Sequence, residues 1–440
     1  MSEQNITAWT SLITVALVIL IFLVPRKYVL LPFVVAACFV PAEQHALIFT
    51  LHFYVVRILV VAGILRILAR GEARCIRWNR FDKLLMAWAV YESFAYILLH
   101  GDFQSVIWRS GQMLEILGLY WIARQSIRTW DDIRTLVRLF ALSAILMVPF
   151  VALEWSTGRN PFSVLGRVGT PYREGAYRCM ASFPHPIIGG AFWVCLAPLF
   201  IGVAKKAQGK LLCWVALGAV MFLAMASHSS TPVGGLGVAL LLMAAYNYRC
   251  YGRHMAIAFF GILAGLHIVM NAPVWALLSR VTIIAGSTGY HRYLLIDGAI
   301  RHFREWALLG TLSTADWGYY LFDITNQYIL EGVRGGFLTL VLFVAILVMA
   351  IRTTAGYSLK NVPDDQKWLS WGICTSILTH CVMFIGVGYF GQILILLYLT
   401  FGFSGLIYEW NTQPVVPVVV TRRRGSPGEV WPSGRAVAIR

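Results

Sequence analysis

Apolar residues along the chain form runs of roughly 16–23 positions that are separated by shorter polar segments. A helix of this length crosses the roughly 30 Å hydrocarbon core of a bilayer, and it satisfies its backbone hydrogen bonds internally. The pattern therefore predicts about 12–13 transmembrane helices, with a long external loop before the last three. The predicted spans lie near residues 8–24, 28–42, 46–68, 84–99, 105–123, 136–154, 187–203, 211–227, 233–247, 255–271, 336–351, 368–389 and 391–408.

Composition excludes a soluble globular protein. Of the 440 residues, 59% are hydrophobic and 13% are charged, whereas about 25% of the residues of a soluble domain are charged. We therefore predict an all-α, polytopic integral membrane protein in which residues 1–410 form a single transmembrane domain. Residues 411–440 are rich in Pro, Val, Gly and Arg without a helical period, which predicts a disordered basic tail.

The distribution of Lys and Arg predicts the orientation of the helices. Of the 36 Lys and Arg residues, 25 lie in the loops after odd-numbered spans and in the tail. By the positive-inside rule these segments face the cytoplasm, so the N-terminus lies outside and the C-terminus is cytoplasmic. The net charge of +16 then reflects contact with anionic membrane lipids. No basic-aromatic module accompanies it, which argues against nucleic acid as a partner.

Two predicted external loops, 155–186 and 271–335, are too long to be simple connectors. The second contains an amphipathic segment around residues 293–306 that predicts a helix at the membrane surface. Both loops concentrate arginines on the side where positive charge is least expected. For any single arginine, solvated charge or contact with lipid phosphates is the simpler interpretation; together they favour an anion site such as a pyrophosphate site. These arginines are Arg159, Arg167, Arg173, Arg178, Arg280, Arg292, Arg301 and Arg304.

Several ionisable residues lie within the predicted spans, where burial of charge is expensive and each is a functional candidate. They are Arg57, Glu92, Arg109, Glu115 and Glu154. The structural alternative is an internal ion pair, for instance Arg57 with Glu92 or with Glu115. No zinc, P-loop or dinucleotide signature is present in the sequence, so we predict no metal and no cofactor.

Short motifs near the end of the second loop follow a known pattern. Arg292 opens an amphipathic helix that leads to a Leu309–Gly310 turn, and Asn326, Tyr328 and Gly335–Gly336 then lead into the next span. This order resembles the O-antigen ligase and polymerase superfamily of bacterial envelope glycan enzymes. Over residues 130–405 as a whole, Phe183-Pro-His-Pro-Ile-Ile-Gly-Gly190 and Tyr389-Phe-Gly-Gln392 resemble two further family motifs.

The chain departs from the family pattern at two positions. Thr325 stands where the family has a His before the Asn. The family's Ser-Arg hairpin signature is represented by Ser229-Ser-Thr-Pro232, which contains no Arg. The resemblance therefore supports the fold and the substrate class more strongly than it supports an intact active site.

The resemblance implies a metal-independent glycosyltransferase of the bacterial inner membrane. Such a polymerase or ligase transfers a saccharide from an undecaprenyl-pyrophosphate donor to an acceptor hydroxyl during surface or exopolysaccharide assembly, alongside other polysaccharide-assembly proteins. In this interpretation Arg292, helped by Arg173 or Arg178, binds the pyrophosphate, and Asn326 and Tyr328 bind substrate.

A general base is also expected, because an acceptor hydroxyl is a poor nucleophile. Asp323 is the first candidate, since on an extended segment it shares a side with Thr325. His291, which directly precedes Arg292, is the second. Two alternatives to the enzyme stay open: a transporter of a lipid-linked glycan or small molecule, and a family member that has lost catalysis.

Overall fold

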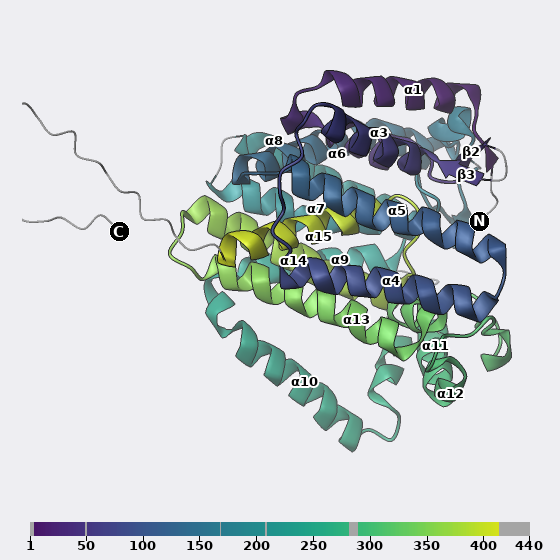
Figure 1. The fold of residues 1–440 in the computed structure, drawn as a ribbon. Coiled ribbons are helices and arrows are strands. Elements are labelled where there is room, and N and C mark those ends of the chain that lie inside the picture. The colour runs from purple at the N-terminus through teal and green to yellow at the C-terminus, as the bar shows by residue number, and fades with distance from the viewer. Residues whose placement is uncertain (1–3, 49–50, 168, 207–208, 281–288, 413–440) are drawn as a thin grey trace, which may run out of the picture.

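The structure is a computed structural model that describes residues 4–48, 51–167, 169–206, 209–280 and 289–412 (Figure 1). The predicted disordered tail lies outside the described residues from position 413 onwards. So does the segment 281–288 of the second predicted loop.

The described chain is almost entirely helical. The long helices are α1 (Ala8–Leu23), α2 (Leu31–Phe39), α3 (Val55–Ala69), α4 (Arg80–His100), α5 (Phe103–Ser126), α6 (Trp130–Thr157), α7 (Pro186–Lys206), α8 (Lys210–Ala226), α9 (Ser230–Ala244), α10 (Gly252–Val269), α11 (Gly289–Arg301), α13 (Gln327–Ser358), α14 (Asp364–Gly386) and α15 (Ile393–Thr412). One-turn α12 (Phe303–Trp306) and the short 3-10 helices η1 (Arg26–Tyr28), η2 (Pro161–Leu165), η3 (Ala245–Tyr251), η4 (Val274–Arg280) and η5 (Ala315–Trp317) lie between them.

Strands are few and short. β1 (Gln4–Asn5) pairs parallel to β2 (Gln44–Ile48), which pairs antiparallel to β3 (Leu51–Tyr54) with Ala46 opposite Phe53. β4 (Tyr172–Arg173) and β5 (Ala176–Tyr177) form a small antiparallel hairpin. The all-α prediction is therefore confirmed at the level of fold class.

Each of the thirteen predicted spans contains a helix. Among the described residues, six helical segments are long and apolar enough to cross a membrane, with α9 and α10 counted as one segment; α1 and α8 are shorter apolar helices. A protein with this many apolar helices is a membrane protein. The number of crossings and the direction of each stay predictions.

Two predicted spans differ from the structure. The span near 28–42 contains only the nine residues of α2, which at 1.5 Å per residue extend about 14 Å, less than half of a bilayer core. The span near 46–68 begins as the β2–β3 hairpin and becomes helical only at Val55. Hydropathy reports the apolar character of a segment but does not distinguish a strand from a helix, so the predicted helical start of the span near 46–68 was wrong.

The outward faces of the helices are apolar, as lipid contact requires. Leu142, Leu146, Phe150 and Leu153 follow helical spacing on α6 and are all exposed. Helix α10 extends away from the bundle in Figure 1, and none of its residues is buried. Apolar side chains of this kind are stable on a surface that faces hydrocarbon rather than water.

The β2–β3 hairpin and the segment before α13 lie at the same end of the bundle. In Figure 1, β2, β3, α11 and α12 lie on the right, whereas α15 runs towards the left. A small core supports the long segment before α13: Leu295 of α11 is fully buried beside Trp306, Trp317 and Val333. The predicted amphipathic helix is thus present as α11. Which end of the bundle faces the cytoplasm still rests on the distribution of Lys and Arg.

Helix α13 is broken near its start. Gly335 and Gly336 leave helical geometry, and Gly336 has φ +79°. A Cβ atom at Gly336 would overlap the carbonyl oxygen of Leu308, and one at Gly310 (φ +100°) would overlap that of Val333. The amide of Phe337 donates to the carbonyl of Ala307 at 2.8 Å, and that of Thr311 donates to Val333 at 2.9 Å. The two glycine motifs therefore fit against each other and dock the α12 region onto the kink.

Candidate functional site

The tight hairpin between α8 and α9 is the meeting point of several predicted motifs. Arg292 Nη2 of α11 donates to Thr231 Oγ1 at 2.8 Å. On the other side, the amide of Cys179 donates to the carbonyl of Ala226 at 3.0 Å, which places the preceding Arg178 beside the hairpin. A Cβ atom at Gly386 would lie 2.7 Å from Thr231. We call Arg178, His185, Thr231 and Arg292 the hairpin site.

Arg292 is partly buried and has no acidic partner among the residues that the structure describes. Burial lowers the pKa of its guanidinium. Within the described residues its Nη2 bonds only to a neutral hydroxyl, and its buried Nε has no hydrogen-bond partner. A cation that is withdrawn from water without a carboxylate is unfavourable unless an anion binds there. Arg292 therefore has the properties of an anion-binding residue.

Arg178 has a similar character on the other side of the hairpin. Burial, and secondarily the charge of Arg173, lower the pKa of Arg178. Its buried Nε has no hydrogen-bond partner among the described residues. Arg173 is exposed on the β4–β5 turn. Two neighbouring cations at the edge of the hairpin strengthen the positive potential that an incoming anion would meet.

His185 is a neutral turn residue rather than a base. The amide of Ile187 donates to His185 Nδ1 at 3.2 Å, and the amide of Gly189 donates to its carbonyl at 3.0 Å. Burial, and then Arg178, lower the pKa of His185 to about 4. With Nδ1 accepting, the ring proton is on Nε2, so neutral His185 can donate a hydrogen bond from that atom.

One candidate base, His291, directly precedes Arg292 and contacts the backbone of the other, Asp323. His291 Nε2 donates to the backbone carbonyl of Asp323 at 3.1 Å. This bond leaves Nδ1 of a neutral His291 with its lone pair available. The Asp323 side chain is exposed on the segment before α13. Thr325 has a buried hydroxyl without a hydrogen-bond partner among the described residues. The structure thus brings His291 against the backbone of Asp323, 32 positions further along the chain.

Asn326 and Tyr328 have structural partners instead. Asn326 Oδ1 accepts the amide of Ile329 at 3.2 Å as the N-cap of α13, and its Nδ2 donates to the carbonyl of Ile385 at 3.4 Å. The hydroxyl of Tyr328 donates to the carbonyl of Cys381 at 3.1 Å. These contacts hold α13 against α14, so they explain both residues without a bound substrate.

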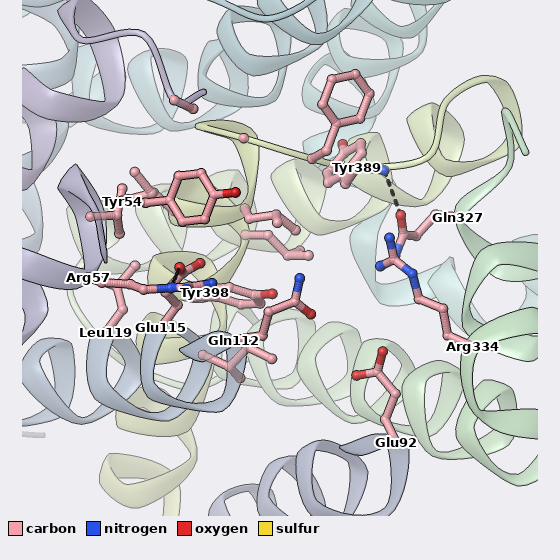
Figure 2. A pocket seen from close by; sticks show the side chains of 18 of the residues that line it. Tyr54, Arg57, Glu92, Gln112, Glu115, Leu119, Gln327, Arg334, Tyr389 and Tyr398 are labelled. Atoms are coloured by element: carbon pink, nitrogen blue, oxygen red, sulfur yellow. Dashed lines mark hydrogen bonds and ion pairs between the residues drawn. The ribbon is translucent and has the colours of Figure 1, made fainter. Parts of the chain in front are cut away.

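A second polar region is a cavity of about 230 Å³ among α3, α4, α5, α13 and the α14–α15 loop. Figure 2 shows that Arg57, Glu115, Gln112, Gln327 and Arg334 surround it. Gln327 Oε1 accepts the amide of Tyr389 at 2.6 Å, which ties the loop to α13. Aromatic side chains complete the lining; they are Tyr54, Trp88, Trp108, Phe343, Tyr389, Phe390 and Tyr398.

Charged residues within the predicted spans form ion pairs around this cavity. Arg57 Nε lies 2.5 Å from Glu115 Oε1, and Arg109 Nη2 lies 2.7 Å from Glu92 Oε2. The side chains of Arg109 and Glu92 are only 1% and 4% exposed. The ion-pair interpretation is therefore confirmed for Arg57, with Glu115 as the partner.

Three residues of the cavity escaped the sequence analysis. Gln327, Glu331 and Arg334 are spaced i, i+4 and i+7, which places them on one face of the first two turns of α13. That spacing just after an N-cap Asn was the signal available in the sequence. It was overlooked because the predicted span began only at 336, beyond the kink.

Other candidates have structural roles. Glu154, at the end of α6, accepts hydrogen bonds from Thr170 Oγ1 at 2.7 Å and from the amide of Ala181 at 2.8 Å, so it organises the loop before α7. Arg167 Nη1 lies 2.6 Å from Glu43 Oε2. Burial raises the pKa of Glu43 and lowers that of Arg167, and the two opposite charges offset part of each change.

Within the described ranges there is no cluster of three or more His, Cys, Asp or Glu side chains that could hold a metal ion. The groups in and beside the hairpin site are guanidinium groups, neutral hydrogen-bond donors and two candidate bases. Comparison of the chain with protein-family models, with curated proteins and with solved structures yields no match.

Proposed function

We propose that this protein is a glycan polymerase or ligase of the bacterial inner membrane, which transfers a saccharide from an undecaprenyl-pyrophosphate donor to an acceptor hydroxyl. The observation that carries the proposal is the state of Arg292. It is half-buried, oriented by Thr231, and without an acidic partner among the described residues. A guanidinium fork of this kind suits the oxygens of a pyrophosphate.

The convergence of distant motifs supports the same proposal. The segments that resemble the O-antigen ligase and polymerase superfamily are the 183–190 turn, the 229–232 hairpin, α11 and the 389–392 turn. Gly190 packs on Pro232, whose Cγ would lie 2.7 Å from a Cβ there, and Gln392 Nε2 donates to the carbonyl of Ser182 at 2.8 Å. Motifs that were linked only by order in the sequence thus lie around one region.

In the proposed reaction the acceptor oxygen forms a bond to the anomeric carbon of the donor sugar. The bond between that carbon and the pyrophosphate oxygen breaks, and the lipid pyrophosphate leaves with the bonding electrons. Arg292, with Arg178 and Arg173, stabilises the growing negative charge. The proton of the acceptor hydroxyl passes to Asp323 or, alternatively, to His291 Nδ1.

The direct test is a deletion strain complemented with the wild-type gene or with Arg292→Ala. A polymerase or ligase predicts loss of surface polysaccharide and accumulation of undecaprenyl-pyrophosphate-linked glycan on the outer face of the membrane. Restored polymer with Arg292→Ala at equal protein abundance would contradict the assignment.

A transporter of a lipid-linked glycan is the second candidate, because α13 is a broken helix beside a polar cavity. Transporters use broken helices to build substrate sites within the bilayer. The same deletion strain separates the two functions. A transporter predicts accumulation of the lipid-linked glycan on the inner leaflet, whereas the enzyme predicts accumulation on the outer leaflet.

A further inference from the structure

The cavity beside α13 has the chemistry of a saccharide site. Its lining combines aromatic side chains, among them Trp88 and Trp108, with the amides of Gln112 and Gln327. Aromatic rings provide flat apolar surfaces for the C–H faces of a sugar ring, and amides and carboxylates bond to its hydroxyls. A cavity of about 230 Å³ is smaller than that of a typical drug-sized ligand, so it suits a single sugar unit.

Among the described residues, all but one of the charged side chains that line the cavity have an ion-pair or hydrogen-bond partner. Arg57 is paired with Glu115, and Glu92 is paired with Arg109. Both oxygens of Glu331 accept hydrogen bonds from neutral donors: Trp88 Nε1 at 3.0 Å and Gln327 Nε2 at 2.7 Å.

Arg334 is the exception. It lines the cavity at the last turn before the kink, and its guanidinium points towards Gln327 in Figure 2. The described residues provide it with no hydrogen bond and no ion pair within 4.0 Å, and the two hydrogen bonds of the nearby Glu331 carboxylate come from Trp88 and Gln327. An arginine fork left open in this way is available to a carboxylate of a ligand.

We propose that the cavity is a saccharide subsite and that Arg334 binds the carboxylate of an acidic sugar. A pyrophosphate fits this cavity poorly. The nearby arginines Arg57 and Arg109 are already paired with Glu115 and Glu92. One open guanidinium therefore remains, and it matches a single carboxylate rather than a multiply charged anion. The hairpin site differs, since Arg178 and Arg292 have no carboxylate partner among the described residues.

The α14–α15 loop connects the two sites. Gly386, at its start, packs on Thr231 of the hairpin site, and Tyr389 and Gly391 line the cavity. A glycan whose pyrophosphate end occupied the hairpin site could therefore place a sugar unit in the cavity. This assignment of the bound sugar to a glycan substrate rests on the proposed function, but the presence of the subsite does not.

The test is a titration of the purified full-length protein in detergent with glucuronate, glucose and inorganic pyrophosphate, followed by ligand-observed NMR. The expected result is that Arg334→Gln weakens glucuronate binding at least tenfold and leaves glucose binding within about twofold. Arg304→Gln, which alters an exposed arginine of α12, is the matched control and should bind as wild type. If Arg334→Gln is unstable, Arg334→Lys keeps the charge, loses the fork and should still weaken glucuronate binding.

Equal glucuronate affinity in the wild type and a folded Arg334 variant would overturn the proposal. Pyrophosphate binding that depends on Arg334 but not on Arg292 would overturn it as well. The outcome is independent of turnover: polymer made by Arg292→Ala would remove the proposed function and leave the subsite intact. Loss of polymer in Arg292→Ala, together with glucuronate binding that does not depend on Arg334, would support the proposed function and remove the subsite.

Discussion

Arg292 Nη2 lies 2.8 Å from Thr231 Oγ1, although 61 positions separate the two residues in the sequence. The hydroxyl orients the guanidinium without neutralising it. A neutral partner of this kind leaves the positive charge available to an anion while reducing the freedom of a long side chain. The α8–α9 hairpin has no arginine at 229–232, and this contact places the guanidinium of Arg292, from α11, beside it.

Substitution of Arg292 is expected to impair polymer formation by at least tenfold, because a lysine keeps the charge but loses the bidentate fork. Arg292→Lys and Thr231→Val should both reduce polymer yield, and Thr231→Ser should retain it through its hydroxyl. Polymer yield and chain length are measured at equal membrane abundance. Arg301→Ala, on the exposed face of the same helix, is the control; an equal effect from that variant would contradict a specific role for Arg292.

The identity of the base is tested by a pair of isosteric changes. Asp323→Asn removes basicity but keeps the shape of the side chain, and it should reduce transfer by about 10²-fold if Asp323 is the base. His291→Gln tests the alternative, since glutamine can still donate to the carbonyl of Asp323. Initial rates are measured with lipid-linked donor. Full activity in both variants would exclude both residues and favour a mechanism driven by stabilisation of the leaving group.

Gly336→Ala is expected to destabilise the protein by about 1–2 kcal/mol or more. The substitution places a side chain at φ +79° and against the carbonyl oxygen of Leu308. Gly356→Ala is the matched control in the same helix, because nothing lies within 4 Å of a Cβ at that position. Thermal unfolding in detergent, followed by size-exclusion chromatography, should show a lower midpoint for Gly336→Ala alone.

Glu92→Gln is expected to destabilise the fold by about 3–5 kcal/mol, because it leaves the buried charge of Arg109 without its carboxylate. Asp297→Asn is the comparison. It breaks an ion pair whose Arg301 side chain is 74% exposed, and it should change stability by less than about 1 kcal/mol. Similar unfolding midpoints for the two variants would show that the Arg109–Glu92 pair contributes little.

Stability should fall as the pH decreases from about 6.5 towards 4, in part through His185. Burial and Arg178 lower its pKa from 6.5 to about 4, so below pH 6.5 the unfolded chain binds the proton more readily than the folded protein. This linkage amounts to about 1–3 kcal/mol at the acid end. His185→Gln keeps an acceptor for the amide of Ile187 but does not titrate. Its unfolding midpoint should fall less between pH 7 and pH 5 than that of the wild type.

Much of the fold could be predicted because the determinants are local. A run such as 139–153, the middle of α6, carries no charged residue, and a bilayer allows such a run to be stable as a helix. The errors arose where local composition allowed two solutions. Gln44–Ile48 and Leu51–Tyr54 are apolar enough for a span, yet they pair as strands.

The candidate site was predicted less completely. Arg292 was identified from motif order, and the two candidate bases from their positions near it and near Thr325. His291 contacts the backbone carbonyl of Asp323, whereas Asn326 and Tyr328 bond to the backbone of α14. Arg334 was overlooked, because an arginine eight residues beyond an N-cap resembles an ordinary charge at a helix start until its neighbours are known.

The sequence by itself determined that this chain is a helical membrane protein, that its cations are unevenly distributed, and that arginines concentrate in two long loops. These properties depend on the free energy of transfer of each side chain between water and hydrocarbon. Each residue contributes to that free energy independently of its distant neighbours. Only the tertiary structure decided which charges neutralise each other. Arg57, Arg109 and Arg167 have carboxylate partners, whereas Arg292 and Arg334 have none among the described residues. Pairing depends on distances of a few ångströms between distant segments, and those distances exist only once the helices have packed.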